Sequence, residues 1–301
     1  MGDPQDWQEE EAVKRLLLLT IVLLAATPLL LGAMRSLSHV VYFTAGQAAA
    51  LGLLGSVTTV NKFGHNADSD TTEDSVWDGS DFGGPIRCFT VPGASAAALY
   101  ISSDDEADAG LSVTVQAINA AWESVTVVQL LGADNGATGT EFVQLGSVDL
   151  LRVNRAFPTS DAAAGNIYIH IDSVDAAVKD GVPDTILTDI VAMIDLAEQQ
   201  TMQACYTVPV GHNALVTRIE VDVADTAANA TGTFRLRAAT DGGAAKTKVD
   251  MLVAEDTFRT ISYDPPMALP EKTDIELTNV SAANGATVKG RFDIILVPNT
   301  L

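Results

Sequence analysis

From about residue 85 to the C-terminus, apolar and polar residues alternate in short runs, and this period of two constrains the fold more than any other feature of the chain. Successive side chains of a β-strand point to opposite faces, so each run predicts a strand with one buried face. The runs cover residues 86–91, 99–102, 111–118, 125–131, 149–153 and 167–171, and then residues 204–208, 216–223, 233–238, 248–253, 257–263, 274–277 and 288–296. Residues 186–194 are ambiguous, because Ile186, Ile190 and Ile194 share a helical face while the run is rich in β-branched residues.

Strands spaced by about 8 to 15 residues, with Gly, Asp and Asn between them, are typical of β-sandwiches and jelly rolls. We therefore predict an all-β chain with two jelly-roll-like β-sandwich domains, preceded by an N-terminal hydrophobic helix and an extended arm. The predicted parts are an acidic tail (residues 1–15), a hydrophobic helix (16–35), a connector or arm (36–84), a first sandwich (85–183) and a second sandwich (184–301).

The two predicted sandwiches share a short motif. The pentapeptide CFTVP at residues 88–92 is echoed by CYTVP at residues 205–209. This echo favours two related sandwiches, each beginning with a strand that its proline ends. Cys88 and Cys205 are the only cysteines, too few for a disulfide scaffold or a Cys-rich zinc site. We expect both to be buried as small apolar side chains rather than to act as a redox pair.

Residues 16–34 form a long apolar segment, with no Asp, Glu, Lys, Arg or His from Leu16 to Met34. As a helix it would be about 28 Å long, close to the roughly 30 Å of hydrocarbon in a bilayer. A helix through Leu24 and Pro28 is compatible with a membrane anchor, since neighbouring groups can satisfy the carbonyl that Pro28 frees. It is equally compatible with a helix buried between subunits. A cleaved secretory signal is disfavoured, because three consecutive glutamates (residues 9–11) stand where a basic region belongs.

The chain carries 39 acidic and 17 basic residues, a formal net charge of −22. Binding to a phosphate backbone needs clustered Lys and Arg, so we exclude nucleic acid as the main partner. Aspartate outnumbers glutamate 27 to 12, and there are only 7 lysines. In molar salt the Debye length falls to about 3 Å and repulsion between surface carboxylates is screened. The composition therefore fits a salt-adapted host, with an ordinary acidic surface as the alternative.

The common catalytic motifs are missing from the sequence: it has no nucleophile elbow, Walker loop, dinucleotide-binding glycine pattern or zinc-protease helix. His170 and Asp172 lie two residues apart, hence on one face of a predicted strand, as a base and its orienting carboxylate would. No nucleophile motif accompanies them. We therefore interpret them as part of a polar strand face, and predict a protein that is not an enzyme and uses no cofactor.

Two acidic clusters are candidates for a calcium site. The first comprises Asp68, Asp70, Glu73 and Asp74, and the second comprises Asp104, Asp105, Glu106 and Asp108. Calcium binds six to eight oxygen ligands of the kind that such loops supply. Neither cluster has the EF-hand spacing, and the alternative is that both are solvated loops.

Several motifs point to one group of proteins. Residues 60–68 have the sequence VNKFGHNAD and are followed by VWDG at residues 76–79. The later motifs are SSD at 102–104, WE at 122–123, RVNRA at 152–156, and YTVP at 206–209 with Gly211. Over about residues 57–215 these motifs resemble a group of virion structural proteins from tailed viruses of marine and other aquatic microbes. The resemblance implies a non-enzymatic capsid-, vertex-, fibre- or tail-associated protein, and it carries over no catalytic residues.

The resemblance also implies partners and a location. The partners would be other copies of this chain and other virion proteins, with lipid contacted through residues 16–34 in a membrane-containing virion. The location would be the capsid or tail exterior, or the virion membrane. We predict that residues 57–84 form an arm docking on a neighbouring subunit, with Phe63 and Trp77 as aromatic contacts and Gly64 in a tight turn; the alternative is a linker. For the whole chain, the alternative is a membrane-anchored cell-surface or adhesion protein with two β-sandwich domains.

Overall fold

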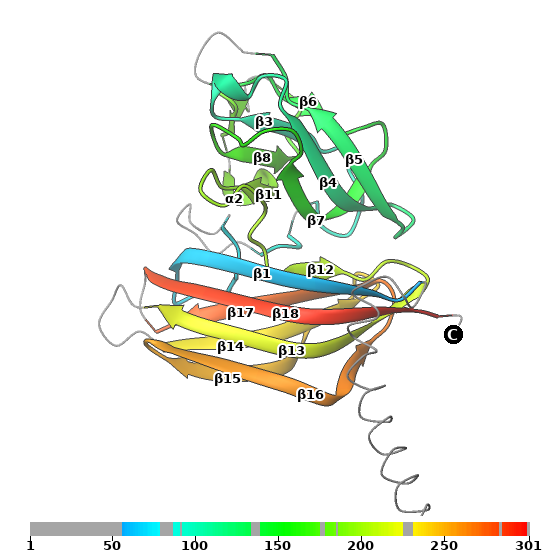
Figure 1. Ribbon diagram of the computed structural model, residues 1–301, viewed down its shortest axis with the longest axis vertical. Helices are drawn as coiled ribbons and strands as arrows, with labels where there is room; N and C mark the ends of the chain where they lie inside the picture. The colour runs from blue at the N-terminus through cyan, green and yellow to red at the C-terminus, as the bar shows by residue number, and fades with distance from the viewer. Residues whose placement is uncertain are drawn as a thin grey trace, which may run out of the picture. The chain divides into compact units, whose positions relative to one another are not determined.

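The computed structural model describes residues 56–78, 87–90, 92–133, 139–174, 178–184, 186–224, 231–282 and 285–299. These residues form an all-β fold in which every strand pair with a defined register is antiparallel (Figure 1). Short helical turns within the described ranges include η2 (Glu106–Asp108) and α2 (Ile186–Asp189). The sheets form two sandwiches, here named the split sandwich and the inserted sandwich.

The split sandwich contains two sheets. The first has the order β1-β18-β13-β16, formed by Thr58–Ser69, Ala286–Pro298, His212–Ala224 and Thr257–Leu269. The second has the order β12-β17-β14-β15, formed by Cys205–Thr207, Thr273–Ser281, Thr231–Thr240 and Lys246–Ala254. The short strand β2 (Asp74–Ser75) pairs with the same β17, so β2 and β12 use successive parts of one strand edge. The chain therefore leaves this sheet after β2 and returns to it at β12.

The inserted sandwich lies in the sequence between those two strands. One sheet has the order β11-β8-β3-β6, formed by Ile190–Ile194, Ile167–His170, Tyr100–Ser103 and Val143–Gln144. The other has the order β5-β4-β7, formed by Ser124–Leu130, Ser112–Asn119 and Leu150–Pro158. A small hairpin adds β9 (Val178–Lys179) and β10 (Val182–Pro183).

Alternating burial explains why these segments are strands. Along β14 and β18 the residues alternate between buried and half-exposed, as expected for one face against a core. Phe234 of β14 and Phe292 of β18 come from different sheets and are fully buried in one core. Val115 of β4 and Ile169 of β8 lie in a second core, between the sheets of the inserted sandwich. Each sandwich thus has its own hydrophobic core.

The predicted strands are confirmed, with one exception and one split. Residues 88–90 lie in a turn, in which the Thr90 N–H donates to the Arg87 carbonyl at 3.1 Å, so the strand predicted at 86–91 is wrong for its described part. The two CxTVP segments are therefore not equivalent strands. The ambiguous segment 186–194 contains a helix followed by a strand: Ile186–Asp189 is α2 and Ile190–Ile194 is β11.

The predicted domain boundaries differ from the sheets. β11 pairs with β8 of the inserted sandwich, although the second sandwich was expected to begin at residue 184. β1 and β2 were expected in a connector or arm, but they are strands of the split sandwich. Backbone pairing is the physical reason, because strand ladders satisfy N–H and C=O groups that an arm would leave to water. The prediction of an extended arm or a linker is therefore wrong for the described residues 57–78, and docking of this segment on a neighbouring subunit stays a prediction.

The hydrophobic helix predicted at residues 16–35 lies outside the described residues, as do Leu16, Leu24, Pro28 and Met34. Within the described ranges, the helices are too short to cross a bilayer.

Trp77 follows β2 and belongs to a small third core rather than to the surface. It is 1% exposed and packs in a cluster with Tyr168, Met193 and the two cysteines. It also forms an isolated antiparallel bridge with Gln203, just before the chain re-enters the split sandwich. The prediction that Trp77 contacts a neighbouring subunit is therefore wrong, because its ring is buried against other side chains of the same chain.

We expect Trp77→Ala to lower the free energy of unfolding by about 3 to 5 kcal/mol, because the large side chain leaves a cavity that its neighbours cannot fill. Phe258→Ala is the control, since Phe258 is 77% exposed. Guanidinium unfolding followed by circular dichroism measures both. Equal effects of the two substitutions would contradict this placement of Trp77.

Candidate functional site: the junction between the sandwiches

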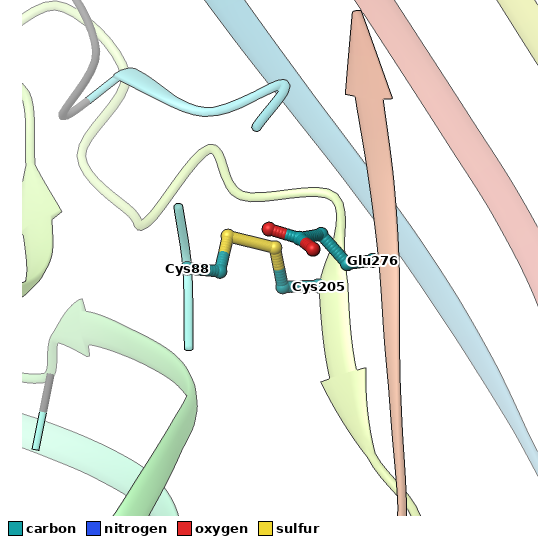
Figure 2. A group of neighbouring side chains, drawn as sticks. All are labelled: Cys88, Cys205 and Glu276. Carbon is teal, nitrogen blue, oxygen red and sulfur yellow. A yellow bond between two sulfur atoms is a disulfide. The ribbon is translucent and has the colours of Figure 1, made fainter. Parts of the chain in front are cut away.

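A disulfide joins Cys88 to Cys205 where the chain passes between the sandwiches (Figure 2). Cys88 lies in the turn before the inserted sandwich, and Cys205 begins β12 after it. The bond spans 117 residues and has a Cα–Cα distance of 6.4 Å. The expectation of two independent, apolar cysteines is therefore wrong, because the echoed motifs meet each other instead of occupying equivalent places. We call the region around this bond, where β1, β2, β12 and β17 meet β7 and residues 87–90 and 92–93, the junction.

Arg152 and Asp274 form a buried ion pair in the junction. Arg152 lies on β7 of the inserted sandwich and Asp274 on β17 of the split sandwich, and each side chain is 4% exposed. The guanidinium donates to the Asp274 carboxylate at 2.8 Å and to the carbonyl of Gly93 at 2.5 Å. Thr207 donates its hydroxyl to the same carboxylate at 2.5 Å. A buried pair is tolerated when further hydrogen bonds satisfy both ions, as they do here.

Lys62 makes a second buried contact across the junction. It lies on β1, is 6% exposed, and donates from Nζ to the backbone carbonyl of Asn154 on β7. Burial, then the nearby Arg155 charge, lowers the pKa of Lys62 to about 7, while Asp78 opposes the shift. The Asn154 amide in turn pairs with β12, accepting from the Thr207 N–H at 2.9 Å and donating to the Thr207 carbonyl at 3.3 Å.

Glu276 organises the third group of contacts, next to the disulfide (Figure 2). Its carboxylate accepts hydrogen bonds from Arg87 Nε, at 2.8 Å, and from the hydroxyl of Ser75 on β2. Ser75 also accepts from the N–H of Cys88 at 2.9 Å. Both sulfurs lie near Glu276, but they are bonded to each other in a disulfide. They are therefore not thiolates and cannot bind a metal as thiolate ligands.

A hollow of about 340 Å³ opens beside these pairs, with Arg87, Arg152, Arg237, Asp274 and Glu276 among its lining residues. Each of its arginines has a carboxylate partner, since Arg237 pairs with Glu73 at 2.7 Å. The walls therefore consist of ion pairs rather than free charge. This arrangement suits a packing junction better than a binding site for a charged ligand.

Most of the motifs singled out in the sequence lie at or near this junction. The NKFG motif supplies Lys62, RVNRA supplies Arg152 and Asn154, and YTVP supplies Thr207. The VWDG motif supplies Trp77, and the carbonyl of Trp122 in the WE motif accepts from the N–H of residue 210 at 2.8 Å. Segments far apart in sequence thus meet in one region, and their common role in this chain is to join the two sandwiches.

Gly64 and Phe63 of the NKFG motif have different roles. Gly64 was expected in a tight turn, but it lies inside β1. A Cβ at Gly64 would be 1.9 Å from the Val76 carbonyl oxygen and 2.6 Å from the Ala204 nitrogen, so close backbone approach is what requires glycine. Phe63 is half-buried and lines a hollow of about 510 Å³ that also includes Phe258. The prediction of a subunit contact at Phe63 stays a prediction.

The first acidic cluster is divided between several local roles. Glu73 accepts hydrogen bonds from Arg237 at 2.7 Å and from Thr278 at 2.6 Å. Asp74 is 1% exposed and accepts from the Asn66 amide at 3.0 Å. Burial raises the pKa of Asp74 to about 7, with the Asp70 charge adding to the shift. In the described part of the chain, no three acids of this cluster gather around one point, and calcium binding there, including at Asp68, stays a prediction.

The second acidic cluster organises loops through hydrogen bonds. Asp104 accepts from the backbone N–H and side-chain amide of Asn166 at 2.7 and 2.9 Å. Asp105 caps η2 by accepting from the Ala107 N–H at 2.8 Å. Asp108 is buried and accepts from Ser103 at 2.6 Å and from the Ala164 N–H at 2.7 Å. Protein donors thus use these carboxylates, and a calcium ion at this cluster, which includes Glu106, stays a prediction.

Three other carboxylates do lie close together. The side chains of Asp172, Asp184 and Asp189 place ligand oxygens within 4.8 Å of one another. Burial, and then repulsion from Asp189 and Asp184, raises the pKa of Asp172 to about 6. Oxygen ligands of this kind suit a hard cation.

His170 has a hydroxyl partner that the sequence analysis did not identify. Its Nε2 lies 3.1 Å from Ser102 Oγ, and both residues are fully buried. The Ser102 hydroxyl donates to the Gly181 carbonyl at 2.7 Å, so the imidazole must be the donor in the pair. Burial lowers the pKa of His170 to about 4. A nucleophile would need the opposite polarity and access to a substrate, so this pair is structural.

Comparisons with known proteins add little. No family model matches the chain, and no curated protein matches it. Three similar solved structures are all of infectious bursal disease virus. The Gx strain is 6% identical over 81% of this chain and 73% of that chain, with a TM-score of 0.23. The VP2 subviral particle is 9% identical over 81% of this chain and 72% of that chain, with a TM-score of 0.22. The T13 viral particle is 10% identical over 81% of this chain and 78% of that chain, with a TM-score of 0.21. At such TM-scores the similarity carries no argument about function.

Replacing both cysteines, as in Cys88→Ala with Cys205→Ala, should lower the free energy of unfolding by about 2 to 5 kcal/mol, because the bond closes a long loop in the unfolded chain. Reduction of the unsubstituted protein should have a similar effect and should leave the double variant unchanged. Guanidinium unfolding with and without reductant measures this. Free thiols detected in the denatured, unreduced protein would contradict the bond.

Asp74 should make stability depend on pH. Its folded pKa of about 7 lies above the ordinary 3.8. Between these values the folded chain retains a proton that the unfolded chain has lost, so the free energy of unfolding falls as pH rises through this window. Asp74→Asn should reduce this decline, as thermal unfolding from pH 4 to pH 7.5 would show. Asp250→Asn, at an exposed site on β15, is the control; an unchanged slope in Asp74→Asn would refute the assignment.

Proposed function

We propose that this protein is a virion structural protein that acts through subunit interfaces, together with copies of itself and other virion proteins. The observation that carries the proposal is the strand order of the split sandwich. Its two sheets, β1-β18-β13-β16 and β2/β12-β17-β14-β15, have the eight-strand order of a jelly roll. Jelly rolls occur in viral capsid domains, and also in lectins and cupins.

The junction supports a structural role over a ligand-binding one. A lectin or cupin would need a pocket with converging free polar groups. In the described residues, the hollow at the junction has its arginines paired, and the buried Ser102–His170 pair has the wrong polarity for nucleophilic catalysis. The buried polar contacts instead hold a second sandwich on the first.

Finer features of the proposal come from the sequence. The motif resemblance favours a capsid-, vertex-, fibre- or tail-associated protein of a tailed virus. The acidic composition favours a salt-adapted host, and residues 16–34 favour either a virion membrane or a helix buried between subunits.

The test is to purify particles from cultures that carry this gene and to follow the chain by mass spectrometry before and after mild chloroform treatment. We expect it to co-purify with particles at a fixed ratio to the major shell protein. Release with lipid would assign residues 16–34 to a membrane, and retention in the shell or tail would assign them to protein contacts. Absence from purified particles, with presence in host envelopes, would refute the proposal in favour of a cell-surface protein.

A further inference from the structure

β5 is an edge strand that lacks the features by which edge strands usually avoid pairing with another chain. It is the outermost strand of the sheet β5-β4-β7, and its sequence is SVTVVQL, without charge, proline or bulge. Every second side chain is exposed, and Val128 and Leu130 are 61% and 57% exposed. Long, flat, uncharged edges invite pairing with another strand.

The hydrogen-bond register shows which groups this edge offers. Beyond the two ends of the β4–β5 ladder, Asn119 N–H donates to the Glu123 carbonyl at 3.0 Å and Leu131 N–H donates to the Leu111 carbonyl at 2.9 Å. Because hydrogen-bonded and non-bonded pairs alternate in an antiparallel ladder, the odd-numbered residues bond to β4. The N–H and C=O groups of Ser124, Thr126, Val128 and Leu130 therefore point away from the sheet, and the Leu130 carbonyl accepts from the Gln129 side chain at 3.1 Å.

In the described residues, the edge strands of the split sandwich carry charge, proline or a covering contact. β15 carries Lys246 and Lys248, and β16 contains two consecutive prolines, at 265 and 266. On β1 the His65 N–H donates to the Met202 carbonyl at 3.3 Å. The edge of β12 is occupied by the Asn154 side chain, which pairs with both backbone groups of Thr207.

The inserted sandwich protects its other edges as well. The Ala156 carbonyl of β7 accepts from the Thr201 N–H at 2.9 Å, and the Ala156 N–H donates to the Thr201 hydroxyl at 3.1 Å. All residues of β11 are buried, and β6 has only two residues. β5 thus differs from the remaining edges of the described sheets.

We propose that β5 pairs antiparallel with β5 of a second copy, forming a continuous sheet across a two-fold axis. The charge of the chain favours contact at β5. Two chains of net charge −22 repel each other, and β5 presents only neutral side chains. The strand also complements itself. Centred on Val127, the pairing sets Thr126 opposite Val128 and Ser124 opposite Leu130 of the other copy. All outward backbone groups then meet partners, with the Leu130 carbonyl exchanging its bond from Gln129 for one from the other copy.

The choice of a second copy rests on the proposed function, which requires the chain to assemble with itself. The pairing extends that function by naming the strand through which two copies meet. A strand from a different virion protein is the competing occupant, and purified chain alone distinguishes the two.

The test uses single cysteines in the full-length chain. In the proposed register Val127 lies opposite Val127 in a non-bonded pair, with Cα atoms about 4.5 Å apart, which a disulfide can bridge. Val125→Cys is the matched control, since it is half-buried on the same strand face but would lie about 13 Å from its copy. On mild oxidation we expect covalent dimers from Val127→Cys and at least tenfold less from Val125→Cys. No dimer from Val127→Cys, or equal yields from the two variants, would overturn the pairing.

A second measurement is independent of crosslinking. Val128→Lys places a charge on the open edge, and Leu252→Lys places one on β15 as the control. The two side chains are similarly exposed, Val128 at 61% and Leu252 at 63%. Sedimentation in nonionic detergent should show at least a tenfold weaker dimer for Val128→Lys and an unchanged one for Leu252→Lys. Equal dimerisation would refute the proposal. Presence in particles without β5 pairing would refute only this inference, and pairing without presence in particles would refute only the proposed function.

Discussion

The structure depends on the way one strand edge is shared. β17 pairs at one part of its edge with β2 and at the next part with β12, and the whole inserted sandwich lies between these two strands in the sequence. A two-residue strand such as β2 has little stability of its own. The chain must therefore hold its exit and its return together by other means, and the Cys88–Cys205 bond next to Glu276 provides a covalent one. The buried polar contacts of the junction provide the rest.

This constraint explains why β17 carries charge inside the protein. Ile275 and Leu277 face the core of the split sandwich, while Asp274 and Glu276 alternate with them on the opposite face, and all four are buried. Desolvating carboxylates is costly, and removing one member of a buried pair typically costs about 3 to 5 kcal/mol. Such pairs do little for net stability compared with apolar packing, but they accept only one partner geometry. The junction therefore gains specificity from Arg152 and Arg87, which match these carboxylates.

Alternation in the sequence was sufficient to predict the all-β class and the longer strands from residue 99 onward, because a period of two is a local property, but it missed β1. It was not sufficient to predict the insertion, because the pairing of Asp74 with Asn279 joins residues far apart and β2 is too short to be recognised. The same limit applies to the site. The pattern at 273–281 predicts one buried face, whereas both are buried, so Asp274 and Glu276 resembled solvent-facing residues. The available signal was the pair of CxTVP segments. They mark the points where the chain leaves the split sandwich and returns to it, but nothing in the sequence shows that their cysteines are bonded to each other.

The distribution of charge connects the fold to assembly. Arginines form the pairs Arg87–Glu276, Arg152–Asp274, Arg218–Asp293, Arg237–Glu73 and Arg291–Glu220 within the chain. The charges of these five arginines are thus matched within the chain, and the surplus of 39 acidic over 17 basic residues remains for the surface. Copies of such a chain repel at a distance, the more so at low salt. Association then requires a short-range contact that no charge opposes, and backbone hydrogen bonding at an uncharged strand edge such as β5 satisfies this condition.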